Sequence, residues 1–171
     1  PMQTFGDPAT AVRSLPGCVI TIEAGEALQA VLARLAARLE CTVNELPPGM
    51  RGRYHAAGGY ASQFVNVLLA EGARIWGSWG GNEQDALRAL LPLLKGTISA
   101  IESVGLDKGM PGPVSRGDVG TVAGHVETLK GMDADAIALY RALCRRTVPI
   151  ALRAGRISEA TARDILGVLG E

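Results

Sequence analysis

The first residues of the chain constrain its fold more than any other feature. Residues 1–5, Pro-Met-Gln-Thr-Phe, form an extended segment with no helix signal, no turn and no initiator methionine. An extended segment needs neighbouring strands, and an isolated two-stranded sheet is only marginally stable in water. The sequence that follows predicts only two more strands before a long series of helices. We therefore expect the rear part of a larger protein, whose missing front part holds the rest of the sheet.

Residues 18–46 predict a strand–helix–strand unit. The β-branched stretch Cys18–Ile22 lies between turn residues and predicts a strand. Leucines at 28, 32, 35 and 39 then recur at helical spacing. The segment Cys41–Leu46 predicts a second strand, which ends at Pro47. Such a crossover unit is typical of an α/β sheet, and the other strands of that sheet are not in the sequence.

After Pro48 the pattern changes to helices. A long helix is predicted from about Arg51 to Gly77, and it contains the pair Gly58-Gly59. Each glycine weakens a helix by about 1 kcal/mol relative to alanine, so we expect another helix or a ligand to approach closely there. Asn82 is the predicted cap of the next helix, which runs to about residue 104 with a proline near its first turns.

Three more helices complete the prediction. Valines spaced along residues 119–129 predict the first, Asp133 is a suitable cap for the second, and Ser158 is a suitable cap for the short last helix. The expected fold is mainly α, a helical bundle preceded by the last strands and helix of a truncated sheet. We place the domain boundary between residues 1–47, the α/β remnant, and residues 48–171, the helical domain.

Composition excludes several classes of function. Lys plus Arg and Asp plus Glu number 17 each, and this balance gives no electrostatic attraction to nucleic acid or to an acidic membrane surface. The three cysteines are far apart, lack metal-ligand spacing and lie in apolar stretches, so we expect buried, reduced side chains. No apolar run reaches the ~20 residues of a membrane span. We expect a cytoplasmic protein with no metal and no nucleic-acid or membrane partner.

The first candidate site lies near the start of the long helix. His55, Ser62 and Gln63 are spaced by seven and eight residues, so they share one helix face beside small Ala and Gly residues. The positive end of the helix dipole favours a neutral imidazole, which can relay a proton near neutral pH. The alternative is that His55 and Ser62 hydrogen-bond the backbone at a helix–sheet junction.

The second candidate is Arg116, in a Pro- and Gly-rich loop between two predicted helices. A guanidinium presented by a stiff loop suits bidentate capture of a carboxylate or phosphate. Asp118 is a suitable N-cap for the next helix, and Arg116 could instead pair with it. His125 is expected to pack or to lie on a helix surface.

No GxGxxG, GxxxxGK[ST], GxSxG or HExxH motif is present, but four stretches together resemble a known family. They are Pro1-Met2-Gln3-Thr4-Phe5, Tyr54-His55-Ala56-Ala57 with Ser62, Leu91-Pro92-Leu93-Leu94-Lys95-Gly96-Thr97, and Gly112-Pro113-Val114-Ser115-Arg116-Gly117-Asp118. These stretches resemble Rossmann-type oxidoreductases whose helical C-terminal domain is known as a domain of unknown function. The layout is similar to ketopantoate reductase, pyrroline-5-carboxylate reductase and the 6-phosphogluconate dehydrogenase group.

The resemblance implies a bundle of the 6-phosphogluconate dehydrogenase C-terminal type that binds a small-molecule substrate and forms a homodimer. His55 would be catalytic, and Ser62, Gln63 and Arg116 would bind substrate, although the family has Asn where this chain has Gln63. NADP or NAD would bind the missing N-terminal Rossmann domain, and no cofactor is expected in this chain alone, which would be inactive.

A second class of function stays open. The small-residue helix faces, the departure at Gln63 and the incomplete catalytic set are also compatible with a non-catalytic dimerisation or ligand-binding module.

Overall fold

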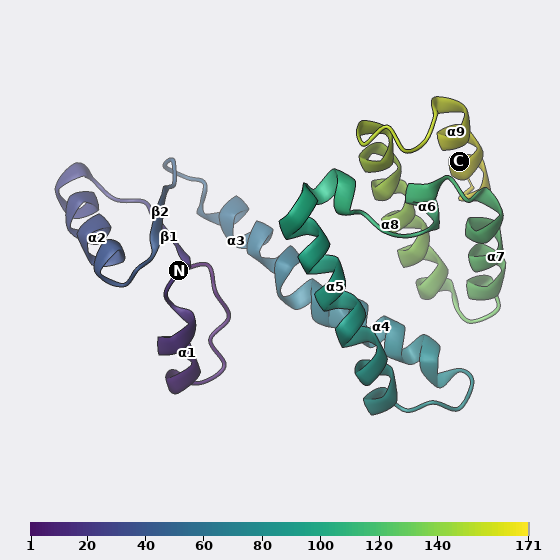
Figure 1. Cartoon of the computed structure of the whole chain (residues 1–171), viewed down its shortest axis with the longest axis horizontal. Helices are drawn as coiled ribbons and strands as arrows, with labels where there is room; N and C mark the ends of the chain where they lie inside the picture. Colours follow the sequence, from purple (N-terminus) through teal and green to yellow (C-terminus); the bar gives the residue numbers. More distant parts are fainter. Residues whose placement is uncertain (171) are drawn as a thin grey trace. The chain divides into compact units, whose positions relative to one another are not determined.

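The computed structural model describes residues 1–170 and shows a mainly α-helical protein with one small parallel sheet (Figure 1). The chain divides into two compact units, Pro1–Ala70 and Glu71–Glu171, and the division falls within a helix. The expected mainly α fold is confirmed. The boundary placed after residue 47 concerns the origin of the two segments and stays a prediction.

The first unit contains the predicted strand–helix–strand arrangement. Its elements are α1 (Pro8–Ser14), β1 (Val19–Ile22), α2 (Glu26–Arg38), β2 (Thr42–Glu45), α3 (Arg51–Ala61) and the first half of α4 (Gln63–Gly77). The two strands are parallel, with Val19 opposite Thr42 and Ile22 opposite Glu45. Cys18, Cys41 and Ala36 form a small buried cluster beneath them.

The opening segment lies along one edge of this sheet. Met2 N donates to Val19 O at 2.8 Å, whereas Thr42 N donates to Cys18 O at 3.0 Å. Successive carbonyls of a strand point to opposite edges, so the opening segment and β2 lie on opposite sides of β1. Among residues 1–170 the sheet has two strands, and β2 has no strand on its outer edge. The sheet therefore keeps one open edge.

Helix α2 carries an apolar stripe that residues 1–170 leave uncovered. Leu28, Val31 and Leu35 follow helical spacing, and each is about half exposed. Ala36, on another face of the same helix, is fully buried in the small cluster beside the strands. Parallel sheets are normally covered on both faces by helices and by further strands. The first unit thus exposes apolar surface on the helix as well as an open strand edge.

The prediction of one long helix from Arg51 to Gly77 is wrong in one respect, because the helix is broken at Ser62. Ser62 has φ −127° and ψ −89°, and it separates α3 from α4. Its hydroxyl donates to Gly58 O at 2.9 Å, which places a side-chain bond on a carbonyl that a continuous helix would use. The weak helix formers Gly58 and Gly59 just before it lower the cost of the break.

The second unit contains the rest of α4 and five further helices. They are α5 (Glu83–Gly109), α6 (Pro113–Arg116), α7 (Val119–Lys130), α8 (Ala134–Arg153) and α9 (Glu159–Val168). The predicted caps are confirmed, because each side chain accepts a hydrogen bond from a backbone N–H three residues later; these are Asn82, Asp118, Asp133 and Ser158. The sequence did not predict α1 or the one-turn helix α6.

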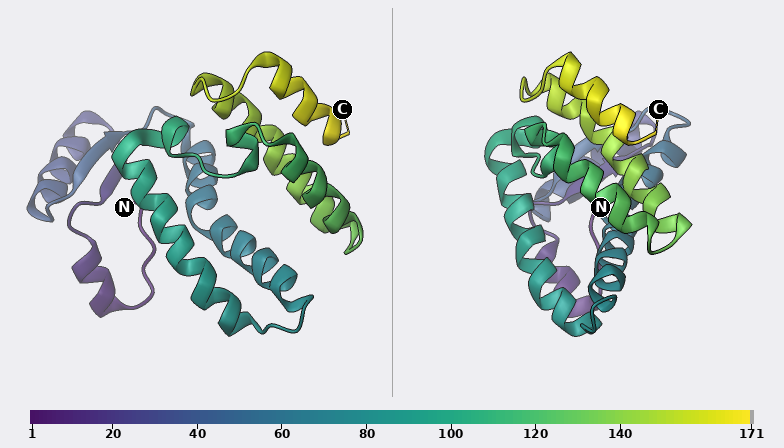
Figure 2. Two further views of the ribbon diagram at one scale, coloured as in Figure 1. Left: turned by 45° about the vertical axis from the view of Figure 1, so that its right-hand side comes forward. Right: turned by 90° about the vertical axis from the view of Figure 1, so that its right-hand side faces the viewer.

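The main hydrophobic core lies among α6, α7, α8 and α9, which remain side by side in both views of Figure 2. The predicted apolar stripe of α7 points into it. Its buried residues are Val114, Val122, Val126, Leu129, Ala136, Ile137, Cys144, Val148, Ala162, Ile165 and Leu169. Cys144 is among them, so all three cysteines are buried, as expected.

Helix α5 is the longest and one of the more apolar helices of the described chain. Its helical geometry is interrupted at Gly105 (φ 80°, ψ 172°), in agreement with the predicted end near residue 104. By length and composition alone α5 could cross a membrane, with a mean hydropathy of 1.3. Lys95 and Glu102 interrupt this stretch, so it holds no uninterrupted apolar run of ~20 residues, as expected from the sequence. None of this apolar window is buried in the structure.

Candidate functional site

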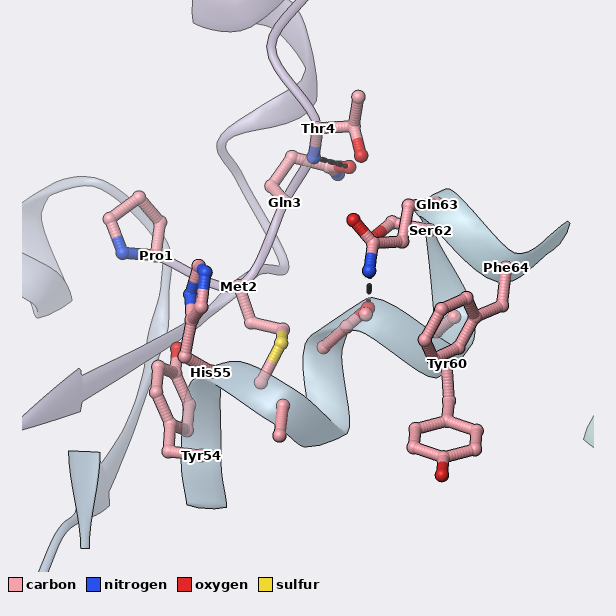
Figure 3. Close-up of a pocket in the computed structure, with 14 residues that line it drawn as sticks. Pro1, Met2, Gln3, Thr4, Tyr54, His55, Tyr60, Ser62, Gln63 and Phe64 are labelled. Atoms are coloured by element: carbon pink, nitrogen blue, oxygen red, sulfur yellow. Dashed lines mark hydrogen bonds between the residues drawn. The ribbon is translucent and has the colours of Figure 1, made fainter. Parts of the chain in front are cut away.

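A cavity of about 760 Å³ in the first unit lies between the opening segment and the junction of α3 with α4 (Figure 3). Its polar lining comes from both sides and includes Gln3, Thr4, Tyr54, His55, Ser62 and Gln63. The three residues predicted to share a face in this part of the chain therefore reach one cavity, even though the helix that was to present them is broken.

Gly58 allows the Met2 side chain of the opening segment to lie close against α3. A Cβ atom built at Gly58 would lie 3.2 Å from Met2 Sδ, which is closer than an ordinary carbon–sulfur contact. A side chain at this position would require the flexible Met2 side chain to shift by a few tenths of an ångström. The close approach expected at the glycine pair is thus present, and the approaching group is the Met2 side chain of the opening segment rather than another helix.

His55 lies on the second turn of α3 with its ring exposed to the cavity. Figure 3 shows the ring beside Met2 and Pro1. The imidazole forms no hydrogen bond or ion pair with another residue of the described chain, so both ring nitrogens are available to a ligand. The alternative in which His55 bonds the backbone at a helix–sheet junction is not formed.

Ser62 behaves differently, because its hydroxyl proton is already used. Ser62 Oγ donates to Gly58 O, so the oxygen can only accept a bond from a ligand. For Ser62 the alternative of a backbone partner is therefore the arrangement found. Gln63 begins α4, and its amide makes no hydrogen bond within residues 1–170.

The opening segment supplies a fixed wall. Gln3 Oε1 accepts from Thr4 N at 2.8 Å, and Gln3 Nε2 donates to Ser14 O at 3.3 Å. Neither Gln3 nor Thr4 was predicted to belong to the site. The only local signal was the glycine pair on α3, which indicated a close approach but not the partner.

The cavity lining contains no Asp, Glu, Lys or Arg side chain. Its titratable side chains are His55, Tyr54 and Tyr60. A lining of this kind recognises neutral polar groups through amides and hydroxyls, and it offers one imidazole that can donate or accept a hydrogen bond. It does not offer a charged clamp for an anion.

Arg116, the fourth predicted site residue, belongs to the second unit and is not among the residues that line this cavity. It is exposed at the end of α6. Asp118 accepts from Thr121 N at 2.9 Å and from Thr121 Oγ1 at 2.6 Å. These bonds are the main cause that lowers the Asp118 pKa below 3.8, and the nearby charge of Arg116 contributes less. The alternative ion pair of Arg116 with Asp118 is not formed.

His125 has a packing role, as expected. Its Nδ1 lies 2.9 Å from Tyr140 Oη, and the two rings meet edge to face with centroids 5.7 Å apart. Burial raises the pKa of Tyr140 and also that of the neighbouring Cys144 thiol. The thiol is therefore held in its unreactive protonated form.

A second cavity, of about 710 Å³, lies at the carboxyl ends of β1 and β2, where α/β proteins commonly bind nucleotides. Its charged side chains are Glu23 and Glu45. Glu23 Oε2 lies 2.5 Å from Arg51 Nε, and its other oxygen accepts from Gly49 N at 3.3 Å. Carboxylates at this edge would repel a pyrophosphate, so these residues do not fit NAD or NADP by themselves. Within residues 1–170 no group of three or more His, Cys, Asp or Glu residues is placed to hold a metal ion.

The fold and the cavity define a class: a mainly helical protein with a parallel strand–helix–strand unit, in which the opening segment and a broken helix enclose a polar cavity. Residues 18–147 match the family described as a domain of unknown function (DUF2520), and the chain belongs to that family. The match covers β1 through most of α8 and leaves out the opening segment. No curated protein and no solved structure matches the chain.

Proposed function

We propose that this chain is the substrate-binding and dimerisation part of a cytoplasmic NAD(P)-dependent oxidoreductase that acts on a small molecule. In this proposal a Rossmann domain that precedes the present chain binds the nucleotide, and the helical region resembles the C-terminal domain of the 6-phosphogluconate dehydrogenase group. His55 exchanges a proton with the substrate, and Ser62 and Gln63 hold its polar groups. Arg116 supplies an anion contact in the second unit.

The observation that carries the proposal is the cavity beside an incomplete parallel sheet. β2 has an open outer edge, and the apolar stripe of α2 is uncovered, so this unit has surface suited to further strands of an α/β domain. The cavity containing His55 lies next to the opening segment, on the other edge of β1. A nucleotide domain that precedes Pro1 would join the chain beside this cavity and would bring its cofactor close to the imidazole.

Nucleotide binding is expected only in the longer protein. The chain from Pro1 to Glu171 should show no heat of binding with NADPH in calorimetry at micromolar concentrations, because its own strand ends carry Glu23 and Glu45. The protein extended upstream of Pro1 should bind NADPH, and its added sequence should contain a strand followed by a glycine-rich turn and a helix. Micromolar binding by the present chain, or no binding by the extended protein, would contradict the proposal.

The contrary result would favour the alternative class, a non-catalytic dimerisation or ligand-binding module. Its supporting observation is the neutral cavity lining, in which no second side chain orients His55.

We expect a homodimer formed through the helical region. In the second unit, α5 exposes a series of large apolar side chains that the unit does not cover; they are Leu91, Leu93, Ile98, Val104 and Leu106. Light scattering after size exclusion should give about twice the chain mass of 17.8 kDa. The variant Leu93→Glu should shift the mass to that of the monomer, whereas Val12→Glu on α1 should not. A Leu93→Glu protein that remains dimeric would show that α5 is not the interface.

A further inference from the structure

Ser115 is the one fully buried polar residue among residues 1–170, and it lies directly before Arg116. Its hydroxyl donates to Met110 O at 2.9 Å, which closes the Gly- and Pro-rich segment between α5 and α6 on itself. A buried hydroxyl needs hydrogen-bond partners, because an unpaired one costs free energy. The conformation of this segment therefore depends on the hydrogen-bond partners of the Ser115 hydroxyl.

The other partner of Ser115 is Arg156, 41 residues later in the turn after α8. Arg156 Nη1 donates to Ser115 Oγ at 3.1 Å and to Met110 O at 2.9 Å. Arg156 Nη2 donates to Lys108 O. One guanidinium thus holds two backbone carbonyls and the buried hydroxyl, and hydrogen bonds from a charged donor are stronger than neutral ones.

The residues on either side of Arg116 are fixed as well. Val114 is buried in the main core. Gly117 has φ +70°, and a Cβ atom there would lie 3.0 Å from Thr161 Cγ2 and 3.3 Å from Ile157 Cγ2. The backbone of α6 is therefore held against α8 and α9 at the positions before and after Arg116, while the Arg116 side chain itself stays exposed.

Arg153 shows that this arrangement is more than a general tie between α8 and the end of α5. Arg153 also bridges to that segment, through Asp107 Oδ1 at 2.9 Å, but none of its side-chain hydrogen bonds goes to α6. Arg156 reaches three residues later and bonds the carbonyl and the hydroxyl that shape the turn into α6. The two arginines differ in the segment that they hold.

We propose that Arg156 is a positioning residue, whose bonds to Ser115, Met110 and Lys108 fix the direction in which Arg116 presents its guanidinium to an anionic substrate group, a carboxylate or a phosphate. This inference rests on the proposed function, because it takes Arg116 as a substrate contact. A guanidinium on a fixed backbone binds an anion without paying the cost of ordering a loop first. Arg156 touches no substrate and acts only through α6.

The test measures order and anion binding separately in the 171-residue chain. Hydrogen exchange followed by NMR should show the amides of Arg116, Gly117 and Asp118 exchanging about tenfold faster in Arg156→Met, because their bonds close α6. The amides of α7 and α9 should keep their rates. Arg156→Lys should restore part of the protection, and Arg153→Met is the matched control that should leave α6 unchanged.

Inorganic phosphate is the probe for the second measurement, followed through the Arg116 side-chain Nε–H signal. Arg156→Met should weaken phosphate binding by about fivefold or more, with partial recovery in Arg156→Lys and wild-type affinity in Arg153→Met. Faster exchange throughout α7 to α9 would overturn the proposal, since Arg156 would then hold the whole bundle together.

The phosphate measurement distinguishes failure of the positioning role of Arg156 from failure of Arg116 as an anion contact. Unchanged phosphate affinity in Arg156→Met, while Arg116→Met abolishes binding, would overturn positioning and leave Arg116 as the anion contact. Unchanged binding in Arg116→Met would remove Arg116 from the proposed function, and the inference would fall with it.

Discussion

Replacing Ile165 with alanine is expected to lower the free energy of unfolding by about 2–5 kcal/mol. Ile165 lies in the middle of α9 and is fully buried in the core that α6, α7, α8 and α9 share. Removing its side chain loses apolar contacts and leaves a cavity that its neighbours fill only in part. Urea unfolding at one fixed protein concentration measures the change as a lower midpoint with an unchanged slope.

Two further variants make this measurement specific. Ile165→Val removes one methyl group and should cost about 0.5–1.5 kcal/mol. Leu143→Ala, on the exposed side of α8, should change stability by less than about 0.5–1 kcal/mol. If Ile165→Ala unfolds at the wild-type midpoint, α9 is not part of the core and the packing of the second unit is not the one described.

Local signals in the sequence were sufficient for most elements of the fold. Asn82, Asp118, Asp133 and Ser158 each cap a helix through a backbone N–H only three residues away, so the pattern needs no knowledge of the rest of the chain. Asp7 follows the same local rule, because it caps α1 by accepting from Thr10 N at 3.0 Å. This cap was not predicted from the sequence. The one-turn helix α6 is too short to give a periodic pattern.

The break at Ser62 shows where periodicity is insufficient. Apart from Gly58 and Gly59, the residues on both sides of Ser62 are compatible with a helix, and the sequence predicts one continuous element. The competition comes from a side-chain bond to Gly58 O together with two glycines that stabilise the helix poorly. Local rules contain both tendencies, and only the geometry of the folded chain shows which of them prevails.

The candidate site was predictable to the extent that it follows helical spacing. His55, Ser62 and Gln63 do reach one cavity, although their roles stay predictions. The opposite wall could not be predicted, because Met2 meets Gly58 across more than fifty residues of sequence. The same holds for Arg156 and Ser115, whose contact joins the turn after α8 to α6. Contacts between distant segments depend on the fold and leave no spacing to detect.

His55→Ala is expected to reduce turnover of the protein extended upstream of Pro1 by about 100- to 10,000-fold, the usual contribution of a side chain that exchanges a proton in the reaction. His55 faces the cavity and has no partner within residues 1–170 that would occupy its ring nitrogens. The assay follows NADPH absorbance with a panel of small carbonyl and imine compounds. Binding of these compounds should change much less than the rate, because Ser62 and Gln63 remain.

The matched variants decide what His55 does. His55→Gln keeps a hydrogen-bonding group but cannot exchange a proton, so it should be as slow as His55→Ala if the imidazole works as an acid or base; restored turnover in His55→Gln would instead make His55 a binding residue. His125→Ala is the control, because His125 is the only other histidine and its Nδ1 bonds Tyr140 in the second unit. Its turnover should match the wild type. Full turnover in both His55 variants would contradict a catalytic imidazole and leave the cavity as a site for binding alone, which is the chemistry that its neutral amides and hydroxyls already support.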